Sequence, residues 1–166
     1  MSERSGTADG VAGELGRDRA SSEERWALGL ISSGHYLSHF YGLALPPLFP
    51  LLKTEFGVTY IELGLAMTAY GFLGGLVQAP VGFLVDRLGP SRVLLAGMAL
   101  IATSVLLMGF VSSYWMLLVL AVFAGLGNSV FHPADYAILA GSVGEKRLGR
   151  AYSLHTCSGF LGGACA

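Results

Sequence analysis

Histidine and aspartate side chains stand inside long apolar stretches of this sequence, at spacings typical of one helix face. His35 and His39 are one helical turn apart, as are His132 and Asp135, and His155 lies in a later stretch. Residues three or four apart share a face of an α-helix. Imidazoles and carboxylates hydrogen-bond polar solutes and exchange protons near neutral pH, and they are costly to place in a membrane. The pattern therefore predicts a site that binds a polar solute, protons or both.

These side chains are predicted to line one water-accessible cavity rather than to face lipid. Asn128 extends the face of His132 and Asp135 by a further turn. For each histidine, a simple hydrogen bond to a neighbouring helix is an alternative that the sequence leaves open. The predicted pathway residues are His35, His39, Asn128, His132, Asp135 and His155.

The composition indicates what kind of protein must position them. Of the 166 residues, 53% are hydrophobic and only 13% are charged, whereas soluble domains carry about 25% charge. The mean hydropathy is +0.60. A net charge of −1 gives no sign of a nucleic-acid partner, and two cysteines are too few for a disulfide framework. The sequence is that of an all-α, polytopic membrane protein.

Uncharged stretches of about 20 residues mark the predicted transmembrane helices. Residues 1–25 are mixed in charge and are predicted to form a disordered cytoplasmic tail, and residues 26–166 an incomplete transmembrane bundle. Lysine and arginine gather in the tail and in the turns near residues 87 and 145. This bias predicts a multi-pass protein of the cell membrane with a cytoplasmic N-terminus. The predicted spans are about 26–50, 60–84, 91–111, 115–139 and 148–166.

Small residues and one proline predict how these spans pack. Gly71 and Gly75 are four residues apart, as are Gly159 and Gly163, which favours close helix–helix contact on one face. Pro133 cannot donate a backbone hydrogen bond, so it is predicted to kink the fourth span beside His132. A plain kink without a role in a binding site is the alternative.

The turn after the second span reads GFLVDRLGPSR at residues 82–92. It resembles the signature of the major facilitator superfamily between the same two helices, although Pro90 and Ser91 replace basic residues. From the residues alone, Arg87 can pair with Asp86, and Asp86 can face the N-terminus of the next helix. The resemblance implies that Asp86 latches the two halves of a transporter in the outward-facing state; a charged turn that only sets topology is the alternative. The residues of this predicted gate motif are Gly82, Asp86, Arg87, Gly89 and Arg92.

A second segment, GLGNSVFHP at residues 125–133, is similar to one in the fosmidomycin-resistance group of drug exporters. The region of His35 and residues 50–56 are similar to that group's first span and its exit. An arginine common in antiporters of the superfamily is replaced by Ala121. The acid that directly follows the His-Pro pair in the group stands one residue later here, as Asp135.

These resemblances imply a twelve-helix fold made of two six-helix halves, with the transport site between them. The chain is then part of the N-terminal half, with four full spans and the start of a fifth. The missing C-terminal half is an implied partner, without which the chain is not expected to alternate access.

The predicted function is secondary active transport of a small organic molecule, with export of a drug or metabolite in exchange for protons. An organic acid or sugar-type solute is the near alternative, and a non-transporting membrane fragment is another. His35 and His39 also have the spacing of one histidine box of a membrane metalloenzyme, but no second box occurs. Neither an enzyme, a metal nor another cofactor is therefore predicted. The predicted partners are the small-molecule substrate, protons, the lipid bilayer and the missing half.

Overall fold

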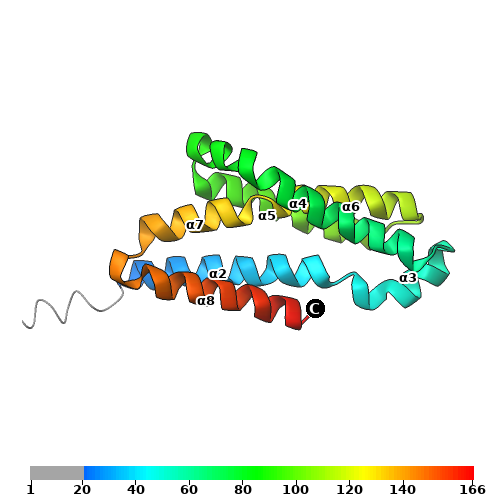
Figure 1. Cartoon of the computed structure of the whole chain (residues 1–166), viewed down its shortest axis with the longest axis horizontal. Coiled ribbons are helices and arrows are strands. Elements are labelled where there is room, and N and C mark those ends of the chain that lie inside the picture. The colour runs from blue at the N-terminus through cyan, green and yellow to red at the C-terminus, as the bar shows by residue number, and fades with distance from the viewer. Residues whose placement is uncertain (1–20) are drawn as a thin grey trace, which may run out of the picture.

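The computed structural model describes residues 21–166, and this part of the chain is helical throughout, with short turns between the helices (Figure 1). The prediction of an all-α chain is confirmed. The helices are α2 (Ser22–Leu43), the short 3₁₀ helix η1 (Pro46–Leu48), α3 (Phe49–Phe56), α4 (Tyr60–Leu88), α5 (Pro90–Met108), α6 (Tyr114–Asn128), α7 (Phe131–Ser142) and α8 (Glu145–Ala164).

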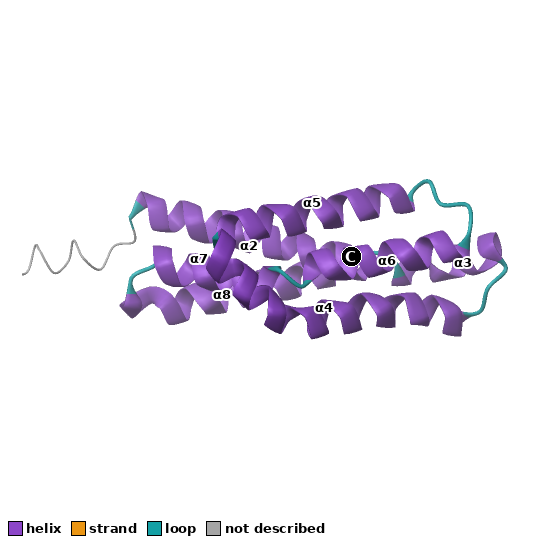
Figure 2. Ribbon diagram, turned by 90° about the horizontal axis from the view of Figure 1, so that it is seen from above, coloured by secondary structure: helices purple, strands orange, loops and turns teal. Residues whose placement is uncertain are grey.

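The helices run along one long axis and form two layers. The first and last, α2 and α8, lie side by side in one layer, and α4, α5 and α6 form the other (Figure 1). Within the second layer α6 packs between α4 and α5 (Figure 2). The remaining helix, α7, contacts α2, α5 and α8, so it joins the layers.

The first helix begins inside the segment predicted to be a disordered tail. Residues 1–20 lie outside the described residues, but Ser22 to Arg25 form the first turn of α2. Its start is fixed by a capping box in which the Ser21 side chain accepts from the Glu24 N–H and the Glu24 carboxylate accepts from the Ser21 N–H. Such caps satisfy backbone donors that have no partner within the helix. The predicted boundary at residue 25 is therefore wrong.

The first predicted span is also shorter than expected. A helix was predicted to reach residue 50, but α2 ends at Leu43, and η1 and α3 follow as separate pieces. The cause is the pair Pro46 and Pro47, because proline lacks an N–H and disfavours the helical conformation in the residue before it.

Other boundaries differ in the opposite direction. The second span was predicted to end near residue 84, whereas α4 continues to Leu88 and stops at Gly89. Gly89 has a φ of 87°, a value that favours glycine, and its N–H is donated to the Val85 carbonyl. The predicted fourth span is interrupted, since α6 ends at Asn128 and α7 begins at Phe131. The fifth begins at Glu145 rather than near residue 148.

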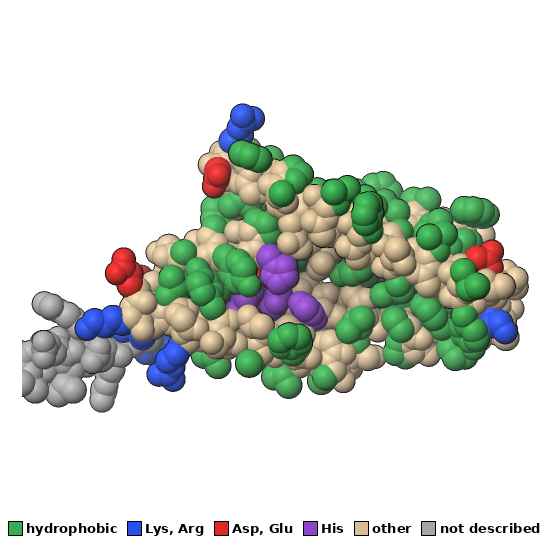
Figure 3. All heavy atoms as spheres, in the orientation of Figure 1, with side chains coloured by type: hydrophobic (Ala, Val, Ile, Leu, Met, Phe, Trp, Pro, Cys, Tyr) green, Lys and Arg blue, Asp and Glu red, His purple; other side chains and the backbone are tan. Residues whose placement is uncertain are grey.

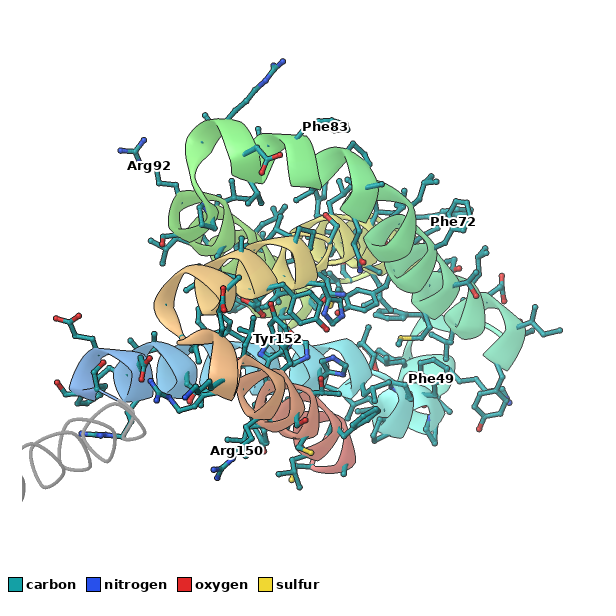
Figure 4. The ribbon with its side chains drawn as sticks, turned by 60° about the vertical axis from the view of Figure 1, so that its left-hand side comes forward. Phe49, Phe72, Phe83, Arg92, Arg150 and Tyr152 are labelled. Carbon is teal, nitrogen blue, oxygen red and sulfur yellow. The ribbon has the colours of Figure 1, made fainter. Side chains whose placement is uncertain are left out.

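Three stretches of the described chain are long and apolar enough to cross a membrane: α4, α5 and the segment Tyr114–Ser142 that contains α6 and α7. Figure 4 shows Phe72 and Phe83 on the outer side of α4, where 65% and 72% of their surfaces are exposed. Such apolar side chains suit contact with lipid. The two other predicted spans, α2 and α8, fall below this apolarity because they carry three of the four histidines, several serines and charged first turns.

Glycines bring the helices of each layer together, and some of the predicted ones take part. Gly159 and Gly163 of α8 lie against His35 and Leu43 of α2. A side chain at Gly71 or Gly75 would meet nothing within 4 Å, so this predicted pair packs against no helix of the described chain. Gly125 of α6 lies against the backbone of Tyr70 of α4, and Gly162 of α8 lies against the backbone of Tyr36 of α2. These two contacts leave no room for a side chain.

Candidate substrate and ion pathway

Asp135 lies at the centre of the polar interior. Its Oδ2 atom is 3.6 Å from His35 Nδ1 and 3.6 Å from His155 Nε2. The three side chains come from α7, α2 and α8, and at most 4% of each is exposed. The structure therefore brings together one carboxylate and two imidazoles from helices far apart in the sequence.

Two further histidines complete this group, which we call the His–Asp cluster: His35, His39, His132, Asp135 and His155. The rings of His35 and His155 are stacked with centroids 3.9 Å apart. His39 and His132 meet the His35 ring edge-on, with centroids 4.6 Å and 5.1 Å away. Figure 3 shows the histidines gathered on one face near the middle of the long axis, whereas lysine, arginine and acidic side chains lie toward the two ends.

Close approach of α8 to α2 creates this cluster. A side chain at Gly159 would lie 2.6 Å from His35 Nε2, so only glycine lets the His35 ring occupy its place. On α8, Tyr152 (labelled in Figure 4) packs edge-on against Tyr136 of α7 with ring centroids 5.1 Å apart. Tyr136 in turn packs edge-on against His155. The cluster is thus bounded by aromatic rings on its α7 and α8 sides.

The buried polar atoms of the cluster lack hydrogen-bond partners among residues 21–166. Both carboxylate oxygens of Asp135, both ring nitrogens of His155 and Nδ1 of His35 are without one. Nearby hydroxyls do not supply them, because Ser38 and Ser158 donate to the backbone carbonyls of His35 and His155 instead. Unpartnered buried polar groups are costly and call for a ligand, an ion or a functional role.

A cavity of about 320 Å³ adjoins the cluster through His39. Asn128 lines this cavity rather than the His–Asp cluster, so the six predicted pathway residues divide between two adjoining places. Tyr70 and Met67 of α4 also line it and were not predicted. A signal for Tyr70 exists in the sequence: it lies in the middle of an uncharged stretch, away from the interfacial positions that tyrosine prefers.

The break between α6 and α7 places the FHP segment beside the cluster. The Ser129 N–H is donated to Gly125 and the Ala134 N–H to Val130, so the helical ladder resumes only after a gap. Pro133 lies in the first turn of α7, where its missing N–H has no helical partner to lose. Phe131 and Ala134 are buried, which turns Asp135 toward α2 and α8.

The predicted gate residues lie apart from this site, at the end of α4. Gly82 is open to its surroundings, and Asp86, Arg87 and Arg92 are exposed. In the described chain no ion pair joins Asp86 to Arg87 and no side chain caps α5, and the gate role of Asp86 stays a prediction. Figure 4 shows Arg92 pointing away from the helices.

At the same end of the molecule, an ion pair joins the starts of α2 and α8. Arg147 Nη2 donates to both Glu24 oxygens, at 2.6 Å and 2.7 Å, and the Gly144 N–H donates to Glu24 Oε1. The hydrogen bond from Arg147, followed by that from Gly144, lowers the pKa of Glu24 below its ordinary value. This contact fixes the layer that carries His35 and His155.

Comparison with known proteins decides the family. The profile described as Major Facilitator Superfamily matches residues 29–166. The chain belongs to this superfamily. The resemblance seen in the turn at residues 82–92 is therefore confirmed, and the chain is part of a major facilitator fold.

Several known proteins are similar to this chain at low identity. The fosmidomycin resistance protein of Escherichia coli is 28% identical over 98% of this chain and 39% of its own length. The uncharacterized MFS-type transporter YfnC of Bacillus subtilis is 27% identical over 82% of this chain and 33% of its own. The probable sulfoacetate transporter SauU of Cupriavidus necator is 26% identical over 64% and 25%. The chain thus spans well under half the length of these relatives.

Proposed function

We propose that the protein is a secondary active transporter that exports a small organic molecule in exchange for protons by alternating access. The observation that carries this proposal is the buried carboxylate of Asp135, held between imidazoles of α2 and α8 beside a cavity. An ionised carboxylate in an apolar interior needs a positive partner. A cation that enters or leaves with it couples ion movement to solute movement.

The substrate is proposed to bind in the cavity next to His39. Tyr70, Asn128 and His39 supply polar groups there, and Met67 and Leu43 supply apolar surface. Mixed lining of this kind suits an organic molecule with few polar groups. Access would alternate as this half of the transporter moves against a second half, as in other secondary transporters built from repeats.

The proposed orientation in the membrane rests on the distribution of basic residues, and the proposed direction of transport rests on the relatives. Arg87, Arg92, Arg147 and Arg150 lie at the end of the molecule where α2 begins, and Lys53 lies at the other end. By the positive-inside rule, this distribution supports a cytoplasmic N-terminus. Export is proposed because similar proteins are named for resistance: the fosmidomycin resistance protein and a multidrug resistance protein B homolog of Mycobacterium tuberculosis.

An organic anion as the transported solute is the second candidate, favoured by the similarity to a probable sulfoacetate transporter. The two candidates differ in what competes for the cavity. If the substrate is a lipophilic drug, an unlabelled drug would inhibit flux of the labelled substrate and a small sulfonate would not. If the substrate is an organic anion, the sulfonate would inhibit that flux and the drug would not.

The proposal is tested with the full-length protein in proteoliposomes. Labelled solute is followed with and without an imposed pH gradient at fixed membrane potential. We expect accumulation against the solute gradient only when protons can flow the opposite way. Solute flux of equal rate and extent with and without the pH gradient would refute proton exchange, and no flux for any solute class would refute transport.

A further inference from the structure

We propose that His35, Asp135 and His155 form a binding site for a divalent transition-metal ion of the Zn²⁺ type. The site was not predicted from the sequence, because the only metal pattern considered there was the pair His35 and His39 on one helix. The three ligands come from α2, α7 and α8, which meet only in the folded chain. Asp135 also carries the transport proposal above, but metal binding is measured without solute flux, so the two proposals can fail separately.

The spacing of the ligand atoms suits a small cation. One ligand atom from each of the three residues lies within 4.8 Å of the others. The two nitrogen–oxygen separations are both 3.6 Å, from Asp135 Oδ2 to His35 Nδ1 and to His155 Nε2. In tetrahedral zinc sites with bonds of about 2.0–2.2 Å, neighbouring ligand atoms lie about 3.4 Å apart. A zinc ion can therefore be bound if each imidazole nitrogen moves a few tenths of an ångström closer to Asp135 Oδ2. The two imidazole nitrogens, which lie within 4.8 Å of one another, must approach each other by a larger amount.

Burial and lack of partners point to an ion rather than to chance proximity. The side chains of His35, Asp135 and His155 are 4%, 1% and 0% exposed. Each offers at least one atom that has no hydrogen-bond partner among the described residues. A metal ion accepts a lone pair from each ligand and so removes this deficit, and its positive charge balances the carboxylate.

The donor set selects the kind of metal. Two imidazole nitrogens and one carboxylate oxygen suit Zn²⁺, Co²⁺ or Ni²⁺, whereas Ca²⁺ and Mg²⁺ prefer oxygen ligands alone. Three protein ligands leave a fourth position open for water or a solute atom. A second group with suitable spacing, His35, His39 and His132, shares one ligand but is less buried.

This second group supplies matched controls for the test. The full-length protein in lipid nanodiscs is stripped with a chelator and titrated with Co²⁺, whose visible absorption reports tetrahedral nitrogen and oxygen ligands. Zn²⁺ is then added as a competitor. We expect one ion per chain for the wild type, with affinity about 10–100-fold lower or lost in Asp135→Asn and His155→Gln. We expect His39→Gln and His132→Gln to bind as the wild type does.

Two outcomes would overturn the site. One is a wild-type protein that shows no stoichiometric Co²⁺ spectrum and no rise in melting temperature with Zn²⁺. The other is loss of binding in His39→Gln or His132→Gln with normal binding in Asp135→Asn and His155→Gln. The melting temperature without metal shows whether each variant is folded, and the wild-type spectrum decides the matter even if a variant is not. Solute flux is measured separately, so failure of transport does not affect this result.

Discussion

His35 and Asp135 are one hundred positions apart in the chain, yet His35 Nδ1 lies 3.6 Å from Asp135 Oδ2 in the buried interior. The contact joins α2 of one layer to α7, which links the layers. A cation bound between these two side chains would be held by both helices, so its binding is expected to change the position of one layer relative to the other. This is the physical basis for linking ion binding to alternating access.

Removal of the Asp135 charge should disable coupled transport. Asp135 is the only buried carboxylate among residues 21–166, and Asn keeps its shape without its charge. We expect Asp135→Asn to lower gradient-driven solute flux at least about tenfold in proteoliposomes with little change in the amount of folded protein. The exposed acid Glu55 provides a control, and Glu55→Gln should transport as the wild type does. Equal flux in both variants would remove Asp135 from the mechanism.

Packing of α8 against α2 should depend on Gly162 and not on Gly75. The backbone of Tyr36 occupies the space that a side chain at Gly162 would need, whereas Gly75 has nothing within 4 Å. We expect Gly162→Ala to lower the free energy of unfolding by about 1–3 kcal/mol. Gly75→Ala should be neutral or slightly stabilising, because alanine favours helix. Thermal unfolding in the same detergent measures both, and equal effects would contradict the contact.

The ion pair of Glu24 with Arg147 should stabilise the protein only while Glu24 is ionised. The hydrogen bond from Arg147 lowers the pKa of Glu24 below its ordinary value of 4.5. A lowered folded pKa means that the stabilisation is present above the unfolded pKa and is lost as the pH falls through the folded pKa. We therefore expect Glu24→Gln to melt a few degrees lower than the wild type at pH 7, with the difference vanishing in acid. A difference that stays constant below pH 4.5 would show that charge is not its source.

A hydrogen bond between α6 and α4 should contribute a smaller amount. The Tyr114 hydroxyl donates to the Glu62 carbonyl at 2.7 Å. Tyr114→Phe removes this bond and should cost about 0.5–1.5 kcal/mol of unfolding free energy. Tyr60 is 54% exposed, and Tyr60→Phe is the matched change without such a bond. Urea or thermal unfolding monitored by tryptophan fluorescence distinguishes the two.

Much of the helix plan could be predicted from the sequence, since uncharged stretches of membrane length are a strong signal. The positions of His35, His132 and His155 on three different helices also followed from spacing alone. Boundaries were less predictable. The end of α2 at Leu43 depends on a proline pair inside an apolar run, and the start of α2 depends on a capping box within a charged tail.

Contacts between helices could be predicted only in part, because they arise from packing of segments distant in the chain: Gly159 lies at a predicted contact, but its partner His35 did not follow from spacing. Gly71 and Gly75 have the spacing of a contact face, yet the same spacing occurs on a face that packs against nothing in the described chain. Tyr70 lines the cavity, although the stretch around it showed only the spacing of its glycines as a feature of interest. The Asp135 side chain points toward His155 because the helix is broken between α6 and α7. The spacing of residues in the sequence does not reveal this break.

The central claim is that polar faces of α2, α7 and α8 meet on a path open to water through the membrane. Aqueous access is measured directly by thiol labelling of the full-length protein, with the exposed Cys157 and Cys165 replaced by alanine. A membrane-impermeant, water-soluble reagent is applied to His39→Cys and Asn128→Cys, with Phe83→Cys as the lipid-facing control. The account predicts rapid labelling of the first two, slowed by substrate, and no labelling of the third. If the thiols of His39→Cys and Asn128→Cys stay unlabelled both with and without substrate, this claim is contradicted.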